Sequence, residues 1–210
     1  SVSSPWVRRL DSHLPMLLDL GTERTVNETA ESALKLLREV KSVTFATVDG
    51  GQPAARIIDV MYVEEDGLYF LTARGKAFHE QLKALPMVAI CGMNEKYVSV
   101  RLVGEIRFCG DKGVVDKIFE RNPMMNDLYP GESRYVLEGI HLYRGRGEIF
   151  DLSTEPPFRQ RFAFGGAHVN PSGYHITDAC IACGLCQEIC SLDVISGGAI
   201  DRIDGTRCLE

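Results

Sequence analysis

The chain has 210 residues, of which 45% are hydrophobic and 25% charged, a balance typical of a globular protein with a proper core. Its net charge of −6 argues against a general nucleic-acid surface, which would need a basic footprint. The sequence lacks both a run of ~20 apolar residues that could cross a bilayer and the apolar core of a secretory signal. We therefore expect a cytoplasmic protein with no membrane and no nucleic-acid partner.

The first 25 residues predict a helical extension, although Pro15 interrupts the pattern. Its apolar side chains recur at helical spacing: Trp6, Leu10, Leu14, Leu17 and Leu18. A stronger helix signal follows, because Thr25 to Glu28 has the form of a capping box. The apolar stripe of this second helix is Ala30, Ala33, Leu34, Leu37 and Val40.

From Ser42 the apolar period becomes strand-like. Strands are predicted over 43–47, 54–63, 68–72, 87–91, 97–108 and 140–151. A short helix is predicted over 76–85, and another begins after Asp111 with Val115, Ile118 and Phe119 on one side. Because hairpin-length connections dominate, we expect an α+β fold with a mostly antiparallel split β-barrel and flanking helices.

The composition changes after Asp151, where Ser153 to Pro157 has the character of a linker. This change predicts three parts. They are an N-terminal helical extension over 1–25, a barrel over 26–152, and a linker with a small ferredoxin-like cysteine-rich tail over 153–210.

Five of the seven cysteines lie in the last 31 residues. The first four of these, Cys180, Cys183, Cys186 and Cys190, have the spacing C-x2-C-x2-C-x3-C, which is the bacterial ferredoxin pattern for a 4Fe–4S cluster. Three thiolates two residues apart can surround one corner of a cubane. The spacing favours cluster ligation over a structural zinc site and over free or disulfide-paired thiols.

Two features depart from the ferredoxin pattern. Ser191 stands where ferredoxins usually have proline, and Cys208 resembles the start of a second motif. In two-cluster ferredoxins the fourth cysteine of each motif binds the other cluster. Either the native chain continues past Glu210, or Cys190 or Cys208 completes a single cluster. The candidate ligands are therefore Cys180, Cys183, Cys186, Cys190 and Cys208.

Three segments carry a further likeness: Ala55 to Val60, Leu68 to Lys76, and Ser99 to Glu105. In this order they resemble the FMN-binding signature of the pyridoxamine 5′-phosphate oxidase-like split-barrel family, over residues 26–152. Phe150 to Ser153 resembles the junction in the branch of that family with a ferredoxin-like tail. The chain lacks the Arg-x-Trp ending of true pyridoxamine phosphate oxidases, so vitamin B6 oxidation is not expected.

The resemblance implies a flavin site. It puts Arg56 and Lys76 on the phosphate, a dianion that requires fixed cations and backbone donors. Along the ribityl chain and ring edge it puts Ile57, Ile58, Leu71 and Thr72. Arg74 is a weaker candidate.

The family builds its flavin site across a dimer interface, so the resemblance also implies a homodimer. Arg101 then faces either the partner subunit or solvent. For His79, a proton donor or haem ligand is one interpretation, but a surface histidine is the one favoured. Cys91 and Cys109 lie in predicted strands and are expected to be buried apolar residues.

Together these features favour an FMN-dependent oxidoreductase that exchanges electrons with the cluster and acts on a small molecule. Its electron donor would be a redox partner protein or a reduced nicotinamide. The alternatives are a non-enzymatic flavin and iron–sulfur electron carrier, and a barrel whose tail binds zinc for structure only. No side chain is singled out as an acid, base or nucleophile.

Overall fold

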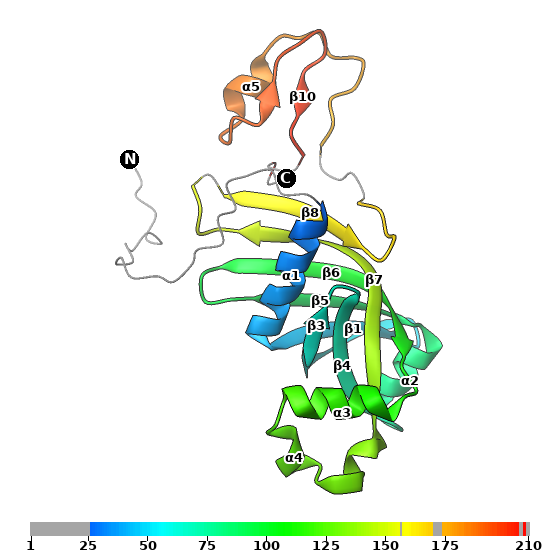
Figure 1. Ribbon diagram of the computed structural model, residues 1–210. Helices are drawn as coiled ribbons and strands as arrows, with labels where there is room; N and C mark the ends of the chain where they lie inside the picture. The colour runs from blue at the N-terminus through cyan, green and yellow to red at the C-terminus, as the bar shows by residue number, and fades with distance from the viewer. Residues whose placement is uncertain (1–25, 156, 170–173, 206–207, 209–210) are drawn as a thin grey trace, which may run out of the picture.

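The computed structural model describes residues 26–155, 157–169, 174–205 and 208 (Figure 1). These residues form a barrel over 26–169, followed by a small cysteine module over 174–208. The helical extension predicted for residues 1–25 lies outside the described residues. Within the described ranges, no helix is both long and apolar enough to span a bilayer.

One antiparallel sheet forms the barrel, in the strand order β2-β1-β5-β6-β7-β4-β3, with β8 added to β7. The prediction of a mostly antiparallel barrel with flanking helices is therefore confirmed. Its strands are β1 (Ser42–Asp49), β2 (Gln52–Asp59), β3 (Tyr62–Glu64), β4 (Gly67–Ala73), β5 (Met87–Met93), β6 (Val98–Phe108), β7 (Leu137–Asp151) and β8 (Phe158–Phe164).

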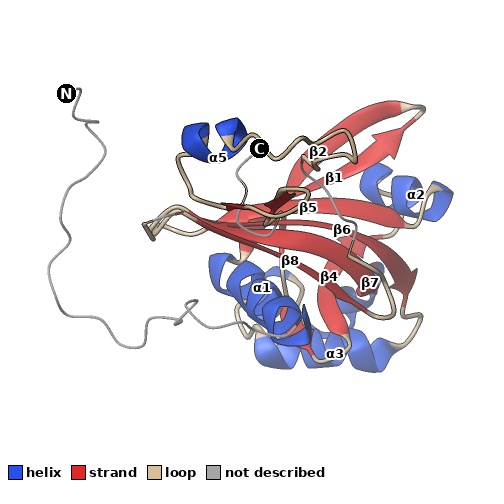
Figure 2. Cartoon of the chain, turned by 90° about the horizontal axis from the view of Figure 1, so that it is seen from above, coloured by secondary structure: helices blue, strands red, loops and turns tan. Residues whose placement is uncertain are grey.

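The helices lie around the barrel (Figure 2): α1 and α2 contribute side chains to its interior core, whereas α3 packs against the outer face of β4. Asp111 begins α3 as predicted, since its carboxylate accepts the Gly113 N–H at 2.8 Å. The helical segments of the barrel are α1 (Val26–Val40), α2 (Ala77–Ala84), α3 (Lys112–Arg121), α4 (Met125–Leu128) and the 3₁₀ helix η1 (Gly131–Val136).

Two apolar clusters stabilise the barrel. The larger fills its interior under α1 and includes Phe45, Phe70 and Phe162, all completely buried. The smaller lies between the outer face of β4 and α3, where Leu71 packs with Phe119. Removing this apolar surface from water supplies most of the favourable free energy of folding.

The single strand predicted over 54–63 is in fact two strands, β2 and β3. The chain changes partners between them: the Val60 N–H donates to the Lys41 carbonyl at 2.8 Å, and the Met61 N–H donates to the Tyr69 carbonyl at 2.8 Å. This crossing brings β2, at one edge of the sheet, into contact with β4 near the other edge. The space between β2 and β4 is called the seam below.

Strand β8 lies in the segment predicted to be a linker. It pairs with β7 over its whole length, and its Phe162 belongs to the main core. The sheet therefore extends to Phe164, past the boundary that was predicted after residue 152. The neighbouring Pro156-Pro157 and Gly165-Gly166 pairs hid the strand, because such residues usually mark loops.

The cysteine module is much smaller than the barrel. It contains α5 (Leu185–Ile189) and a hairpin of β9 (Ile195–Ser196) and β10 (Arg202–Ile203). The Asp204 N–H donates to the Val194 carbonyl at 2.8 Å and so closes the hairpin. The module's buried residues are Val194 and Asp201, among those the structure describes.

Candidate functional site

Arg56 lies on β2 with its side chain on the inner face of the sheet, because it pairs in register with the buried Phe45. Its guanidinium donates to Thr47 Oγ1 at 2.6 Å and to Gln81 Oε1 at 2.7 Å. It also lies over the Phe78 ring, 4.6 Å from the centroid. These contacts fix Arg56 beside α2.

Gln81 holds this arrangement from its other end, because its amide donates to Asp49 Oδ2 at 2.9 Å. Burial lowers the pKa of Arg56, and the nearby Asp49 carboxylate opposes that shift. A guanidinium remains charged in proteins, so the group is a fixed cation near the helix.

Lys76 is the N-cap residue of α2, with an extended backbone and an exposed side chain that does not cap the helix. The first-turn N–H groups of α2 and the positive end of its dipole lie beside Lys76. Arg56 contacts Phe78 and Gln81 of the same helix. A helix N-terminus with one cation at its start, Lys76, and a second cation packed against the same helix, Arg56 of β2, is a donor set that suits a phosphate dianion, so these residues fit the flavin phosphate.

The other predicted flavin contacts lie along the seam. Ile57 is exposed on the outer face of β2, and Ile58 is half-buried against the core. Leu71 and Thr72 are buried in β4. The two predicted pairs therefore lie on strands that touch across the seam, and β4 also contacts α2.

Arg74 is held by other groups: it donates to the Tyr135 carbonyl at 2.8 Å, and its Nε is 3.3 Å from Glu138 Oε2. The same carboxylate oxygen lies 2.8 Å from His79 Nε2. His79 is buried, with 8% of its side chain exposed, so the favoured prediction of a surface histidine is wrong. It occupies the face of α2 that packs against the barrel and meets Phe108 edge-on.

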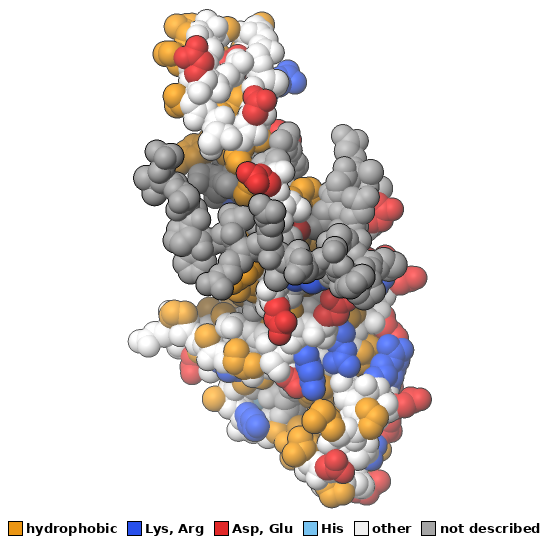
Figure 3. Space-filling model, turned by 90° about the vertical axis from the view of Figure 1, so that its left-hand side faces the viewer, with side chains coloured by type: hydrophobic (Ala, Val, Ile, Leu, Met, Phe, Trp, Pro, Cys, Tyr) orange, Lys and Arg blue, Asp and Glu red, His pale blue; other side chains and the backbone are white. Residues whose placement is uncertain are grey.

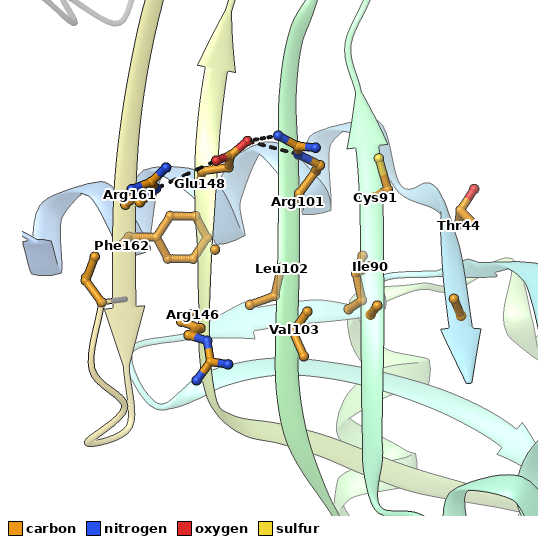
Figure 4. A pocket seen from close by; sticks show the side chains of 14 residues that line it. Thr44, Ile90, Cys91, Arg101, Leu102, Val103, Arg146, Glu148, Arg161 and Phe162 are labelled. Atoms are coloured by element: carbon orange, nitrogen blue, oxygen red, sulfur yellow. Dashed lines mark hydrogen bonds and ion pairs between the residues drawn. The ribbon is translucent and has the colours of Figure 1, made fainter. Parts of the chain in front are cut away.

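Arg101 lies on the outer face of the sheet, the face opposite Arg56. Strand register places Thr44, Cys91, Arg101, Glu148 and Arg161 in one row across β1, β5, β6, β7 and β8 (Figure 4). Glu148 bonds Arg101 and lies 3.9 Å from Arg161 Nε. Within one chain, Arg101 is separated from β2 by three strand spacings, roughly 14 Å.

Cys91 is exposed on this row, so the prediction that it is buried is wrong; Cys109 is half-buried. The error follows from strand alternation, since the buried positions of β5 are Val88, Ile90 and Gly92. A hollow of about 500 Å³ lies over the same face. Its floor includes Ala46, Ala89 and Val103, and sequence periodicity alone did not indicate it.

His141 is a buried histidine that the sequence did not single out. Its ring stacks on Tyr69 at 4.2 Å between centroids, and its Nε2 lies 2.9 Å from the Asp66 carbonyl. Arg107 Nε donates to His141 Nδ1 at 3.2 Å, which fits a neutral ring protonated on Nε2. Burial lowers the pKa of His141, in spite of the Asp66 carbonyl.

In the cysteine module, backbone N–H groups surround some of the thiols. The Ala182 N–H donates to Cys180 Sγ at 3.3 Å, and N–H groups of residues 192–194 lower the pKa of Cys190. The Cys186 thiol donates to Asp201 Oδ2 at 3.3 Å, and this bond raises the pKa of Cys186. The thiols are suitable donors for a cluster, but in the described part of the chain no three His, Cys, Asp or Glu side chains form a metal-binding group.

Comparison with known proteins assigns the two regions to different relatives. A family model for pyridoxamine 5′-phosphate oxidase matches residues 29–135. The fold is similar to a NimC/NimA family protein from Clostridium acetobutylicum (TM-score 0.57, 25% identity, 66% of this chain and 94% of that one). It is also similar to a protein related to general stress protein 26, from the same organism (TM-score 0.52, 14% identity, 66% and 94% covered).

A ferredoxin from Butyribacterium methylotrophicum is 51% identical over 35 residues, which are 17% of this chain. The chain spans 64% of the length of that ferredoxin.

Proposed function

Because this chain belongs to the pyridoxamine 5′-phosphate oxidase family, we propose that it binds FMN in the seam and acts as a flavin-dependent oxidoreductase in the cytoplasm. The observation that carries this proposal is that Lys76 begins α2 and that Arg56 contacts Phe78 and Gln81 of the same helix. In this proposal the flavin exchanges electrons with a 4Fe–4S cluster in the cysteine module and oxidises or reduces a small molecule.

The proposed roles of the barrel residues combine the family resemblance with their contacts. Arg56 and Lys76 neutralise the phosphate, and the first-turn N–H groups of α2 bind its oxygens. Gln81 and Thr47 position Arg56. Backbone groups at Ile57, Ile58, Leu71 and Thr72 line the path of the ribityl chain toward the ring. Once bound, FMN supplies hydride or single-electron transfer, which no protein side chain provides.

The cluster assignment rests on the likeness to a ferredoxin and on the cysteine spacing. Cys180, Cys183 and Cys186 are proposed as ligands, with Cys190 or Cys208 as the fourth. Thiolate ligation of this kind suits a reducing compartment.

We also propose a homodimer formed through the outer sheet face. Besides the hollow, this face exposes large apolar side chains on four strands: Val48, Ile57, Met87, Met93 and Val103. Contiguous exposed apolar surface of this kind marks interaction sites. A two-fold dimer would bring the same face of each copy together, so that Arg101 of one copy approaches the seam of the other.

Titration of the flavin-free protein with FMN tests the central proposal. Arg56→Ala and Lys76→Ala should each raise Kd on the order of tenfold to a hundredfold, the effect of losing a charge-assisted hydrogen bond. The control is Lys96→Ala, which removes an exposed cation from the β5–β6 turn and should leave Kd unchanged. Equal affinity in all four proteins would reject this phosphate site.

Turnover assays decide whether the bound flavin makes the protein an enzyme. With a reduced nicotinamide or a reduced ferredoxin as donor, oxidation of the donor that depends on a small-molecule acceptor would support the oxidoreductase. Reduction of the bound flavin without turnover would instead indicate an electron carrier.

A further inference from the structure

The hollow on the outer sheet face combines an apolar floor with a basic rim. Ala46, Ala89 and Val103 form the floor, from β1, β5 and β6. Four charged side chains stand around it (Figure 4). They are Arg101, Arg146 and Arg161, with Glu148 as the single acid. The formal charge of these four side chains is +2, because three arginines surround one glutamate.

The cysteine module has the complementary surface. Ile181, Leu185 and Ile189 follow one another at intervals of four residues and are 84%, 62% and 82% exposed. We call these three side chains the ridge; hydrophobic side chains are visible on the module surface in Figure 3. Leu185 and Ile189 share one face of α5, because residues four apart on a helix are neighbours.

Most of the charged residues around the ridge are acidic. Between residues 174 and 205 the sequence has five acids and one base, Arg202. The exposed acids nearest the ridge in sequence are Asp178, Glu188 and Asp193. Each of the two surfaces therefore has an apolar centre surrounded by charged side chains. These charges are mainly positive around the hollow and mainly negative around the ridge. Such complementarity steers association and excludes wrong partners.

The chain leaves the barrel at the hollow, because Val169 is one of the lining residues and the module begins at Tyr174. A two-fold dimer through this face brings the outer sheet faces of the two copies together. The start of each module then lies at the dimer interface, within reach of the partner's outer sheet face. Five residue steps span at most about 18 Å, so the module remains close to this interface.

We propose that the cysteine module of one copy docks on the outer sheet face of a second copy, with its ridge in the arginine-rimmed hollow. This inference rests on the proposed homodimer. It makes the hollow an intermolecular docking site, which neither the family nor the ferredoxin likeness specifies. It also places the cysteine loop on the face that carries Ile57 and Arg101.

Site-specific photocross-linking tests the docking in the full chain, purified anaerobically. A benzophenone amino acid replaces Ile189, whose side chain is 82% exposed, so folding is not at risk. Protein labelled with ¹⁵N is mixed with unlabelled protein before irradiation. We expect cross-linked peptides of mixed label that join residue 189 to β5 or β6 near Ala89 and Val103.

Charge reversal sharpens the test. Arg146→Glu should lower the cross-link yield on the order of tenfold, because it places an acid against the acidic module. High salt should lower the yield as well. Lys35→Glu changes the same charge at an exposed site on α1 and should leave the yield unchanged. Adducts confined to one chain, adducts elsewhere on the barrel, or a yield insensitive to Arg146→Glu would overturn the proposal.

Flavin content and molecular mass, measured on the same samples, distinguish a failure of the docking proposal from a failure of the proposed function or of the dimer. A protein that binds no FMN would reject the proposed function. A monomeric protein would reject the proposed dimer. A flavin-containing dimer that cross-links only within each chain would reject the docking alone.

Discussion

The barrel and the cysteine module are stabilised in different ways. The barrel buries large apolar side chains from β1, β4, β5, β6, β7 and β8 in one main core. The module has two-residue strands and exposes three large aliphatic side chains near the cysteines, Ile181, Leu185 and Ile189. The core therefore holds the barrel residues proposed to bind FMN in place, whereas under the proposals above the module is stabilised by its cluster and by a partner surface. Small domains without a sufficient hydrophobic core usually need a bound metal, a disulfide or a partner chain to be stable.

The largest effect is expected from Cys183→Ser. Loss of one central ligand should reduce the iron content to background and remove amide-exchange protection from the module, because metal binding and folding are coupled in such domains. The melting temperature of the barrel should not change. Cys91→Ser, on the barrel, is the matched control and should keep its iron. Full iron occupancy in Cys183→Ser would remove this residue from the ligand set.

Phe162→Ala tests whether β8 belongs to the barrel. The side chain is completely buried in the main core, so its truncation should lower the free energy of unfolding by about 3–5 kcal/mol. The cluster content should stay the same in the folded protein. Chemical denaturation followed by fluorescence gives the difference. A change below about 1 kcal/mol would mean that β8 is not an integral part of the core.

The barrel should also lose stability in mild acid because of His141. Its folded pKa lies below the ordinary value of 6.5, so the unfolded chain takes up a proton first as the pH falls. Stability should therefore be complete above about pH 6.5 and decrease below it, by at most about 1.4 kcal/mol per pH unit. Denaturation of the wild type and His141→Asn between pH 7.5 and about pH 5 tests this. An equal slope in both proteins would exclude His141 as the cause.

A smaller effect is expected from Gln81→Ala. Gln81 positions Arg56 without being a proposed flavin contact, so its loss should weaken FMN binding by about 1 kcal/mol, or roughly fivefold in Kd. Lys83→Ala, on an exposed face of the same helix, is the control. If Gln81→Ala affected only stability, with Kd unchanged, Gln81 would have no positioning role.

The two regions also differ in what their sequences predicted. Alternation in 97–108 and the Asp111 cap predicted β6 and α3 well, because local patterns determine such elements. The break between β2 and β3 and the pairing of β8 depend on distant partners, Lys41, Tyr69 and β7, that no local pattern specifies. Tertiary packing likewise decided the burial of His79 and the exposure of Cys91.

For the site, motif likeness indicated Arg56 and Lys76, and the structure shows that both are associated with α2. The residues that support them, Thr47 and Gln81, were not predicted, since neither belongs to a motif. In the module the cysteine spacing predicted candidate cluster ligands, with the fourth left open between Cys190 and Cys208, but it carried no information about the ridge. That surface emerged only from the exposure of three side chains.

The most direct test of the two-region account is a UV–visible spectrum of anaerobically purified protein, with flavin, iron and sulfide assayed on the same sample. The account predicts bound FMN together with about four iron and four sulfide per cluster. Flavin without iron would leave the barrel assignment intact and reject a stably bound cluster in this chain. Zinc without flavin would contradict the proposed function and leave only the fold.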